Sequence, residues 1–186
     1  MSKRRTPRLL VVLACLVALA GCSGLSGTGG KEYITHEGKV TEVDPADRSD
    51  AIDYSGEDLS GEPLALADLR GRPVVVNVWW SACPPCRVEQ PELNGAADEL
   101  GERVAFVGLN IRDASADNGL AYVRAQDVDY PSFYSPDGKA LLPFAGTLSP
   151  RSIPSTVVLD EQGRVAAAII GILPSQQTLV SVVEKV

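Results

Sequence analysis

The chain has 186 residues, of which 17 are Lys or Arg and 24 are Asp or Glu, giving a formal net charge of −7. This acidic balance argues against nucleic acid as the main partner, and a hydrophobic share of 45% excludes wholesale disorder. One histidine in the whole sequence leaves little room for a histidine-based metal site or catalytic dyad.

The first 21 residues have the pattern of a secretory signal. Residues 1–8 carry basic side chains and no acidic one, and residues 9–20 are an unbroken apolar run. At about 1.5 Å per residue this run spans about 18 Å, too short for a hydrocarbon core of roughly 30 Å, although a shortened transmembrane anchor is the alternative. The following cysteine, Cys22, ends the sequence Leu-Ala-Gly-Cys, which resembles the lipobox of bacterial lipoproteins. The resemblance implies cleavage before Cys22 and a lipid on its sulfur, which would hold an exported protein on the extracytoplasmic side of the cell membrane.

Cleavage after residue 21 would change both the charge and the cysteine count. It would leave 165 of the 186 residues, with 13 basic against 24 acidic side chains, so the formal charge would become −11. Cys15 would leave with the signal, and Cys22 would carry the lipid. Cys83 and Cys86 would then remain as the two thiols of the exported protein, in an oxidising compartment.

Residues 22–49 are predicted to be a flexible tether. Residues 23–31 are rich in glycine and serine, and residues 32–50 carry many charges without a strong apolar period. The lone histidine, His36, lies in this segment, and we interpret it as a solvated linker residue. The packed domain is therefore expected over residues 50–186.

Within this domain, strand and helix patterns alternate. A β-hairpin is predicted between Ile52 and Leu66, with its turn near Gly61. A strand buried on both faces is predicted over 74–80, and the helix over 87–100 that follows should be kinked at Pro91. The other expected elements are a helical turn over 66–71, a strand over 104–109, a helix over 120–126, a strand over 130–134, a helix over 139–145, strands 156–159 and 165–170 joined as a hairpin, and a helix over 174–186. This order predicts an α/β sheet with helices on both faces and an antiparallel edge.

Cys83-Pro84-Pro85-Cys86 lies between the predicted central strand and its helix. Unpaired N–H groups and the helix dipole at a helix N-terminus favour an anion, so the pKa of Cys83 should fall below the free value of about 8.5. The Cys83 thiolate would attack a disulfide, and Cys86 would resolve the resulting mixed disulfide. A structural disulfide is one alternative, but so short a bridge constrains the unfolded chain little. A metal site is another, but two thiolates leave two tetrahedral ligands unsupplied and His36 is remote, so we expect neither metal nor cofactor.

Five sequence segments together resemble thioredoxin-fold proteins, and most closely the TlpA/ResA-type group of membrane-tethered thiol–disulfide oxidoreductases. They are LADLRG at 66–71, VNVW at 76–79, CPPC at 83–86, EQP at 89–91 and IPSTVVLD at 153–160. The resemblance covers about residues 50–186. It implies a thioredoxin fold, with a central mixed β-sheet flanked by helices and an added N-terminal β-hairpin.

The resemblance also implies a role for individual residues. Cys83 becomes the attacking thiol and Cys86 the resolving thiol of a redox-active disulfide. Pro154 matches the cis-proline of the family, although cis bonds are rare among X–Pro bonds in general. The backbone of Ile153 would pair with an extended substrate segment, and Trp79 is expected to contribute to the same substrate-binding surface.

Three further positions bear on proton transfer and on the exposure of Cys83. Asn77 stands where many thioredoxins have a buried aspartate, and asparagine cannot titrate. Glu89, three residues after Cys86, matches a functional acid of the family, which would oppose thiolate formation or carry protons. The alternative is a glutamate in the first helical turn that the helix dipole stabilises. Ala82 replaces the tryptophan usual in the family, so we expect Cys83 to be less covered.

These features favour an enzyme that reduces protein disulfides outside the cytoplasmic membrane. Pro84 and Pro85 have no N–H to offer the Cys83 thiolate, which leaves mainly the amide of Cys86, and a less stabilised thiolate favours a reductase over a strong oxidant. The resemblance implies apocytochrome c as a substrate and a membrane electron donor for re-reduction.

Three other functions share some of these features. A disulfide-forming oxidase has the same CxxC chemistry, and only its potential distinguishes it. A copper-delivery lipoprotein would have His36 as its only candidate ligand once Met1 is removed. A peroxiredoxin shares the fold, but its Pro-x-x-x-Thr-x-x-Cys signature is absent, since Cys83 and Trp79 stand at the Thr and Pro positions counted from Cys86.

Overall fold

The structure is a computed structural model, and it describes residues 33–34 and 38–186. The predicted signal, Cys22 and His36 lie outside the described residues. Within the part described, no helix is both long enough and apolar enough to span a membrane.

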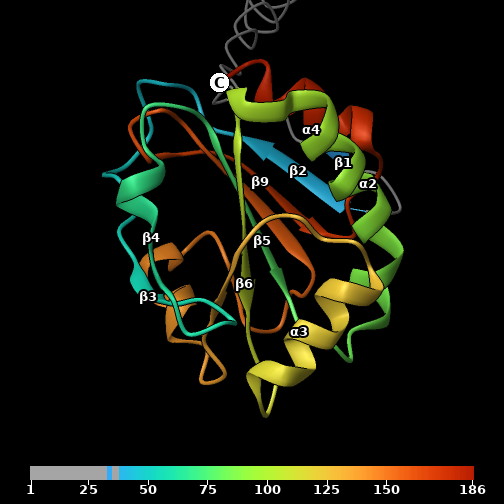
Figure 1. The fold of residues 1–186 in the computed structure, drawn as a ribbon. Coiled ribbons are helices and arrows are strands. Elements are labelled where there is room, and N and C mark those ends of the chain that lie inside the picture. The colour runs from blue at the N-terminus through green and yellow to red at the C-terminus, as the bar shows by residue number, and fades with distance from the viewer. Residues whose placement is uncertain (1–32, 35–37) are drawn as a thin grey trace, which may run out of the picture.

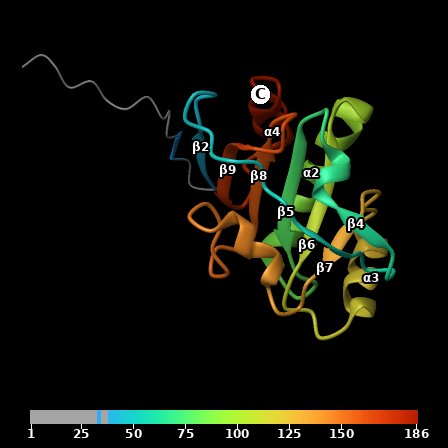
Figure 2. The same ribbon diagram turned by 90° about the vertical axis from the view of Figure 1, so that its left-hand side faces the viewer.

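A mixed sheet of seven described strands runs through the middle of the molecule (Figure 1). Its order is β1 (Tyr33–Ile34), β2 (Gly38–Glu42), β9 (Val165–Gly171), β8 (Ser155–Leu159), β5 (Val74–Trp79), β6 (Ala105–Asn110) and β7 (Ser132–Tyr134). The strands β5, β6 and β7 are parallel, and every other neighbouring pair is antiparallel. In Figure 2 the strands from β2 to β7 follow one another across the view in this order.

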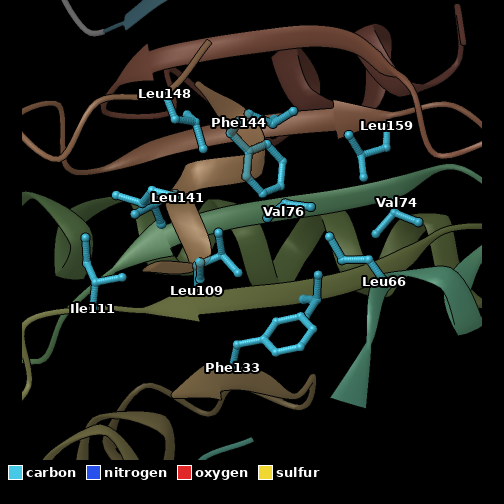
Figure 3. Packing of buried hydrophobic residues seen from close by; sticks show 14 of the residues in the cluster. Leu66, Val74, Val76, Leu109, Ile111, Phe133, Leu141, Phe144, Leu148 and Leu159 are labelled. Carbon is cyan, nitrogen blue, oxygen red and sulfur yellow. The ribbon is translucent and has the colours of Figure 1, made fainter. Parts of the chain in front are cut away.

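The central strand β5 confirms the prediction of a strand buried on both faces. All of its residues are buried, and most of them are β-branched valines, which suit a packed strand. Side chains alternate along a strand, so Val76 faces one side of the sheet while Val75 and Asn77 face the other. The Val76 face packs against Leu109, Phe133 and their neighbours, as Figure 3 shows.

The three α-helices of the described residues lie on one face of this sheet (Figure 1), and 3-10 helices lie on the other, so helical segments flank the sheet as predicted. The α-helices are α2 (Pro84–Leu100), α3 (Ala116–Ala125) and α4 (Gln176–Val183). The strands β5, β6 and β7 step in one direction across the sheet, so right-handed crossovers place both connecting helices on the same face.

The opposite face is covered by short elements. They are β3 (Ser55–Glu57), β4 (Pro63–Ala65), and the 3-10 helices η1 (Leu66–Leu69) and η3 (Lys139–Phe144); a third 3-10 helix, η2 (Gly101–Arg103), follows α2. The strands β3 and β4 pair antiparallel, and Gly61 between them has a φ of 84°. The segment predicted as a helix over 139–145 is 3-10 because Pro143 has no N–H to donate four residues back.

The folded part begins before residue 50, so the predicted tether over 22–49 extends too far. Strand β2 pairs antiparallel with β9, with Val40 opposite Ile169. Val40 is buried, and the amide of Val43 donates to the carbonyl of Ala166 at 2.8 Å. This short strand next to the sheet edge contains few apolar residues, so no periodic apolar pattern marks it in the sequence.

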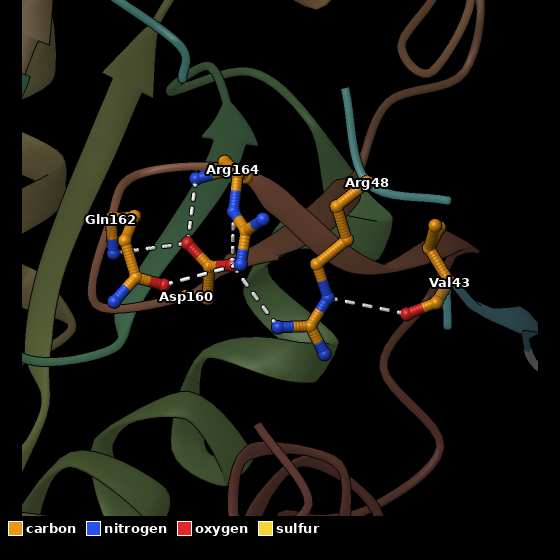
Figure 4. Close-up of polar contacts among 5 residues, drawn as sticks. All are labelled: Val43, Arg48, Asp160, Gln162 and Arg164. Atoms are coloured by element: carbon orange, nitrogen blue, oxygen red, sulfur yellow. Dashed lines mark hydrogen bonds and ion pairs between the residues drawn. The ribbon is translucent and has the colours of Figure 1, made fainter. Parts of the chain in front are cut away.

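A buried carboxylate fixes the β8–β9 turn and attaches the N-terminal segment to it (Figure 4). Asp160 accepts from the amides of Gln162 and Arg164, and forms ion pairs with Arg164 at 2.8 Å and with Arg48 at 3.1 Å. Burial opposes ionisation, but the hydrogen bonds from Arg164 and Arg48 outweigh it and hold the pKa of Asp160 below its usual value.

We expect Asp160→Ala to lower the free energy of unfolding by roughly 3 kcal/mol, because it leaves the buried charge of Arg48 without its carboxylate. Only 6% of the Arg48 side chain is exposed. Asp53→Ala removes an exposed ion pair with Arg70 and should cost at most about 1 kcal/mol. Urea titration measures both changes, and equal losses would contradict this assignment.

Candidate redox site

The two cysteines lie at the junction of the central strand and its helix, as predicted. Strand β5 ends at Trp79, and Cys83 is the N-cap residue of α2. Cys83 and Cys86 are joined in a disulfide, with their Cα atoms 5.3 Å apart. The amide of Cys86 donates to the sulfur of Cys83 at 3.1 Å, which confirms the expected donor. The first two helical positions are prolines, which have no N–H to add.

The disulfide is more covered than the sequence suggested. Cys83 is 3% exposed and Cys86 1%, although Ala82 itself is exposed. Ala82 leaves little opening because the aromatic side chains around the disulfide come from other positions. The two sulfurs belong to a cluster that includes Trp79 and Tyr122, with Trp80, Tyr134 and Ile153 packed beside it.

The segment before β8 is brought to the same cluster. The Ile153–Pro154 peptide bond is cis, as the resemblance implied. The side chain of Ile153 packs against the cluster that contains the two cysteines. Within the described residues the backbone N–H and C=O of Ile153 have no hydrogen-bond partner, whereas the carbonyl of Pro154 accepts from Gly171. An extended peptide beside the disulfide would therefore find unpaired backbone groups at Ile153.

Trp79 lies beneath this surface rather than on it. Its indole is buried, stacks on Tyr122 with 4.5 Å between ring centroids, and donates to the hydroxyl of Ser132 at 3.3 Å. A side chain held in this way supports the site from within. The predicted contact between Trp79 and substrate is therefore not compatible with its position.

Glu89 is a buried acid one turn beyond Cys86. It lies in the second turn of α2 and is 1% exposed, so the alternative of a glutamate in the first turn that the helix dipole stabilises is wrong. One carboxylate oxygen accepts from the side-chain amide of Asn77 at 2.8 Å, and the other accepts from the backbone amide of Leu173 at 2.7 Å. The same amide of Asn77 also donates to the hydroxyl of Thr156 at 3.1 Å. Three separate parts of the chain thus meet at one carboxyl group.

Burial raises the pKa of Glu89 from its ordinary value of 4.5 to about 7, against the opposing effect of the hydrogen bonds from Leu173 and Asn77. Loss of solvation outweighs the two donors because the carboxyl group is almost wholly removed from water. Glu89 therefore changes its protonation near neutral pH, where an ordinary glutamate is already ionised. A group of this kind can accept or release a proton during thiol chemistry.

Tyr122 and Asp113 were not identified from the sequence. The hydroxyl of Tyr122, on α3, donates to the carbonyl of Cys86 at 3.1 Å. The buried carboxylate of Asp113 accepts from the amide and hydroxyl of Ser81 at 3.0 and 2.6 Å, and from Asn110 at 2.7 Å. No periodic pattern marks Tyr122, but Asp113 follows a parallel strand at its carboxyl end, a common position for site residues.

The described residues contain no cluster of potential metal ligands. Among residues 33–34 and 38–186, no three His, Cys, Asp or Glu side chains are placed to hold a metal ion.

We expect Glu89→Gln to abolish a pH dependence of stability. Between pH 4.5 and about 7 the folded protein keeps a proton on Glu89 that the unfolded chain has released. The free energy of unfolding of the natural protein should therefore fall as pH rises through this window, by about 3 kcal/mol in all. The Gln variant lacks this group, so its own curve should lack this fall, as urea titrations at several pH values will show.

Glu99→Gln is the matched control for this experiment. Glu99 lies on the same helix and accepts from the side chain of Gln176, but it is exposed. Its variant should keep the pH dependence of the natural protein. Parallel curves for the natural protein and Glu89→Gln would show that Glu89 titrates at its ordinary pKa.

Comparison with known sequences agrees with this geometry. A sequence model of the AhpC/TSA family matches residues 48–168. The chain is 29% identical over 152 residues to the thioredoxin-like protein YneN of Bacillus subtilis, covering 81% of this chain and 85% of the relative. It is 35% identical over 113 residues to the thiol:disulfide interchange protein DsbE of Pseudomonas aeruginosa, covering 59% and 57%. It is 29% identical over 126 residues to the thiol-disulfide oxidoreductase ResA of Bacillus cereus, covering 66% and 68%.

Solved structures confirm the predicted thioredoxin-like fold. A DsbF homologue from Corynebacterium diphtheriae aligns with a TM-score of 0.75 and 31% identity, covering 85% of this chain and all of the other. A secreted thiol-disulfide isomerase from Corynebacterium glutamicum aligns with a TM-score of 0.73 and 31% identity, covering 83% and 96%. With the family model matching well over half of its length and a cysteine pair at the start of α2, the chain belongs to the AhpC/TSA family and is a thioredoxin-like thiol–disulfide oxidoreductase of the ResA and DsbE type.

Proposed function

We propose that this protein is an exported, lipid-anchored reductase of protein disulfides that acts through Cys83 and Cys86. The observation that carries the proposal is the cysteine pair at the N-terminus of α2, beside unpaired backbone groups of Ile153 and one turn from the buried acid Glu89. The secreted relative from Corynebacterium glutamicum supports a location outside the cytoplasm.

The proposed reaction is a two-step exchange in which one disulfide breaks for each that forms. In the reduced protein the Cys83 thiolate attacks a substrate disulfide, forms a mixed disulfide and releases the first substrate thiolate. Cys86 then attacks the sulfur of Cys83, which releases the second substrate thiolate and closes the Cys83–Cys86 disulfide. Two electrons pass to the substrate, and the two protons lost by the cysteines balance those gained by the substrate thiols.

Glu89 is proposed to receive the proton that Cys86 loses before its attack. Positions three residues apart share one face of a helix, so the carboxyl group lies on the same side of α2 as the sulfur of Cys86. Its pKa of about 7 matches a proton transfer near neutral pH. Asn77 and the amide of Leu173 would stabilise the carboxylate while it is ionised.

Substrate is proposed to bind as an extended segment alongside Ile153 and Pro154. The unpaired N–H and C=O of Ile153 offer a short β-type pairing, which would hold a substrate cysteine close to Cys83. The haem-site cysteines of apocytochrome c are the proposed physiological substrate, and a membrane electron donor would restore the dithiol.

A low reduction potential is expected for the cysteine pair. The Cys86 amide is the donor at the Cys83 sulfur, and Pro84 and Pro85 add none, so the thiolate of the reduced form is weakly stabilised. Equilibration with thioredoxin and glutathione should give a potential at or below about −200 mV. A value near −120 mV, typical of strong oxidants, would instead identify a disulfide-forming enzyme.

Two serine variants separate the roles of the two cysteines. The purified full chain in non-ionic detergent should reduce insulin, and Cys86→Ser should trap substrate on Cys83 as a stable mixed disulfide. Cys83→Ser should trap none.

The lipid anchor is proposed to rest on Cys22. The exported chain would be strongly acidic, so electrostatic attraction to anionic lipids would not hold it at a membrane. In bacterial cells given a labelled fatty acid, the natural chain should carry label and sediment with membranes, whereas Cys22→Ser should be unlabelled. Equal labelling of the two chains would contradict this attachment site.

A further inference from the structure

Three exposed arginines near the redox disulfide form no ion pair with any carboxylate in the described part of the chain. They are Arg87, Arg112 and Arg151. The cations that do form ion pairs contact carboxylates elsewhere, namely Arg48, Arg70, Lys139, Arg164 and Lys185. Arg72, Arg103 and Arg124 also form no ion pair in this part of the chain. What distinguishes the first three is their place, since Arg87 and Arg112 contact the residues just before Cys83 and Arg151 lies two residues before Ile153.

Arg87 follows Cys86 directly and folds back towards the start of the helix. Its guanidinium donates to the carbonyl of Ser81 at 2.7 Å, two residues before Cys83. It also lies over the ring of Tyr122, 5.6 Å from the centroid. Both contacts leave the positive charge uncompensated by any anion, and both hold it on one side of the cysteine loop.

Arg112 holds a second positive charge next to the residues that precede Cys83. Its guanidinium lies 6.0 Å from the centroid of the Trp80 ring and donates to the carbonyl of Pro150. It therefore links the residues before Cys83 to the segment that leads to the cis peptide bond. Arg151, the next residue along that segment, is exposed.

The carboxylates of this region do not neutralise these arginines. Asp113 is buried and accepts from Ser81 and Asn110, and Glu89 is buried beneath the disulfide. Asp117, in the first turn of α3, is exposed and is the nearest such carboxylate to Arg112 in the sequence. The exposed charged side chains next to the proposed substrate segment at Ile153 are thus predominantly positive.

We propose that Arg87, Arg112 and Arg151 select protein substrates that carry Asp or Glu beside the reacting cysteines. The inference rests on the proposed function and adds the chemistry of the substrate to it. A segment lying along Ile153 and past Cys83 would bring acidic side chains near Arg112 and Arg151 and near Arg87. Complementary charge of this kind raises the rate of productive encounter more than it changes the exchange chemistry.

The test uses three peptides that differ only at the positions flanking one disulfide, which carry Asp, Asn or Lys. The reduced full chain, in non-ionic detergent, supplies both electrons in a single turnover, so no further reductant enters. Each second-order rate constant is divided by that of the same peptide with dithiothreitol, which removes differences in leaving-group pKa. At low ionic strength we expect the Asp peptide to react about tenfold faster than the Lys peptide, and the ratio should shrink at 1 M salt, where charges are screened within about 3 Å.

Arginine variants locate the effect. Arg112→Gln combined with Arg151→Gln should lower the ratio below threefold. Arg72→Gln combined with Arg103→Gln removes the same charge near the amino ends of β5 and β6, roughly 20 Å away along the strand, and should leave the ratio above threefold.

Each outcome decides for or against the proposal. A ratio below threefold for the natural chain overturns it, as does an equal loss of preference in the two double variants. Because the Asn peptide reports reduction without flanking charge, failure to reduce any of the three peptides would count against the proposed reductase function instead.

Discussion

The buried carboxyl group of Glu89 is the contact around which the redox end of the molecule is arranged. It joins the central strand through Asn77, the active-site helix that carries it, and the β9–α4 connection through the amide of Leu173. An acid without solvent is costly unless it is neutral or well bonded, so these three elements cannot shift independently. The same contacts of Glu89 therefore fix the position of the helix that carries the disulfide and set the proton affinity of the acid next to it.

The position of this acid explains the asparagine in the central strand. Asn77 cannot titrate, but its side-chain amide donates to Glu89 and to Thr156. An aspartate at residue 77 would offer no donor and would place a second acid against Glu89, where like charges raise the pKa of one group further. Asparagine in β5 and glutamate in α2 are thus complementary, and the helix contributes the buried acid whose pKa lies near neutral pH.

The parts of the fold that the sequence predicted are those with a strong local signal. The valine run of β5, the CxxC at a strand–helix junction and the β8–β9 hairpin need only local patterns, and the cis bond before Pro154 came from the family resemblance. Strand β2 was missed because its few residues carry too short an apolar alternation. The placement of all three described α-helices on one face follows from strand order, which depends on distant pairings rather than local sequence. Tyr122 and Leu173 act on the site through a hydroxyl and a backbone amide brought there by tertiary packing.

The β6–β7 crossover acts on the redox site by supporting the active-site helix. Tyr122 of α3 contacts the carbonyl of Cys86, Gln90 of α2 donates to the hydroxyl of Tyr130, and Asn94 of α2 donates to the carbonyls of Gln126 and Asp127. Successive turns of α2 are thus attached to one crossover, and its first residues also supply Asp113, which holds Ser81. Sequence changes in this crossover would reach the cysteines through the position of the helix N-terminus, so the crossover can tune the disulfide without touching a substrate.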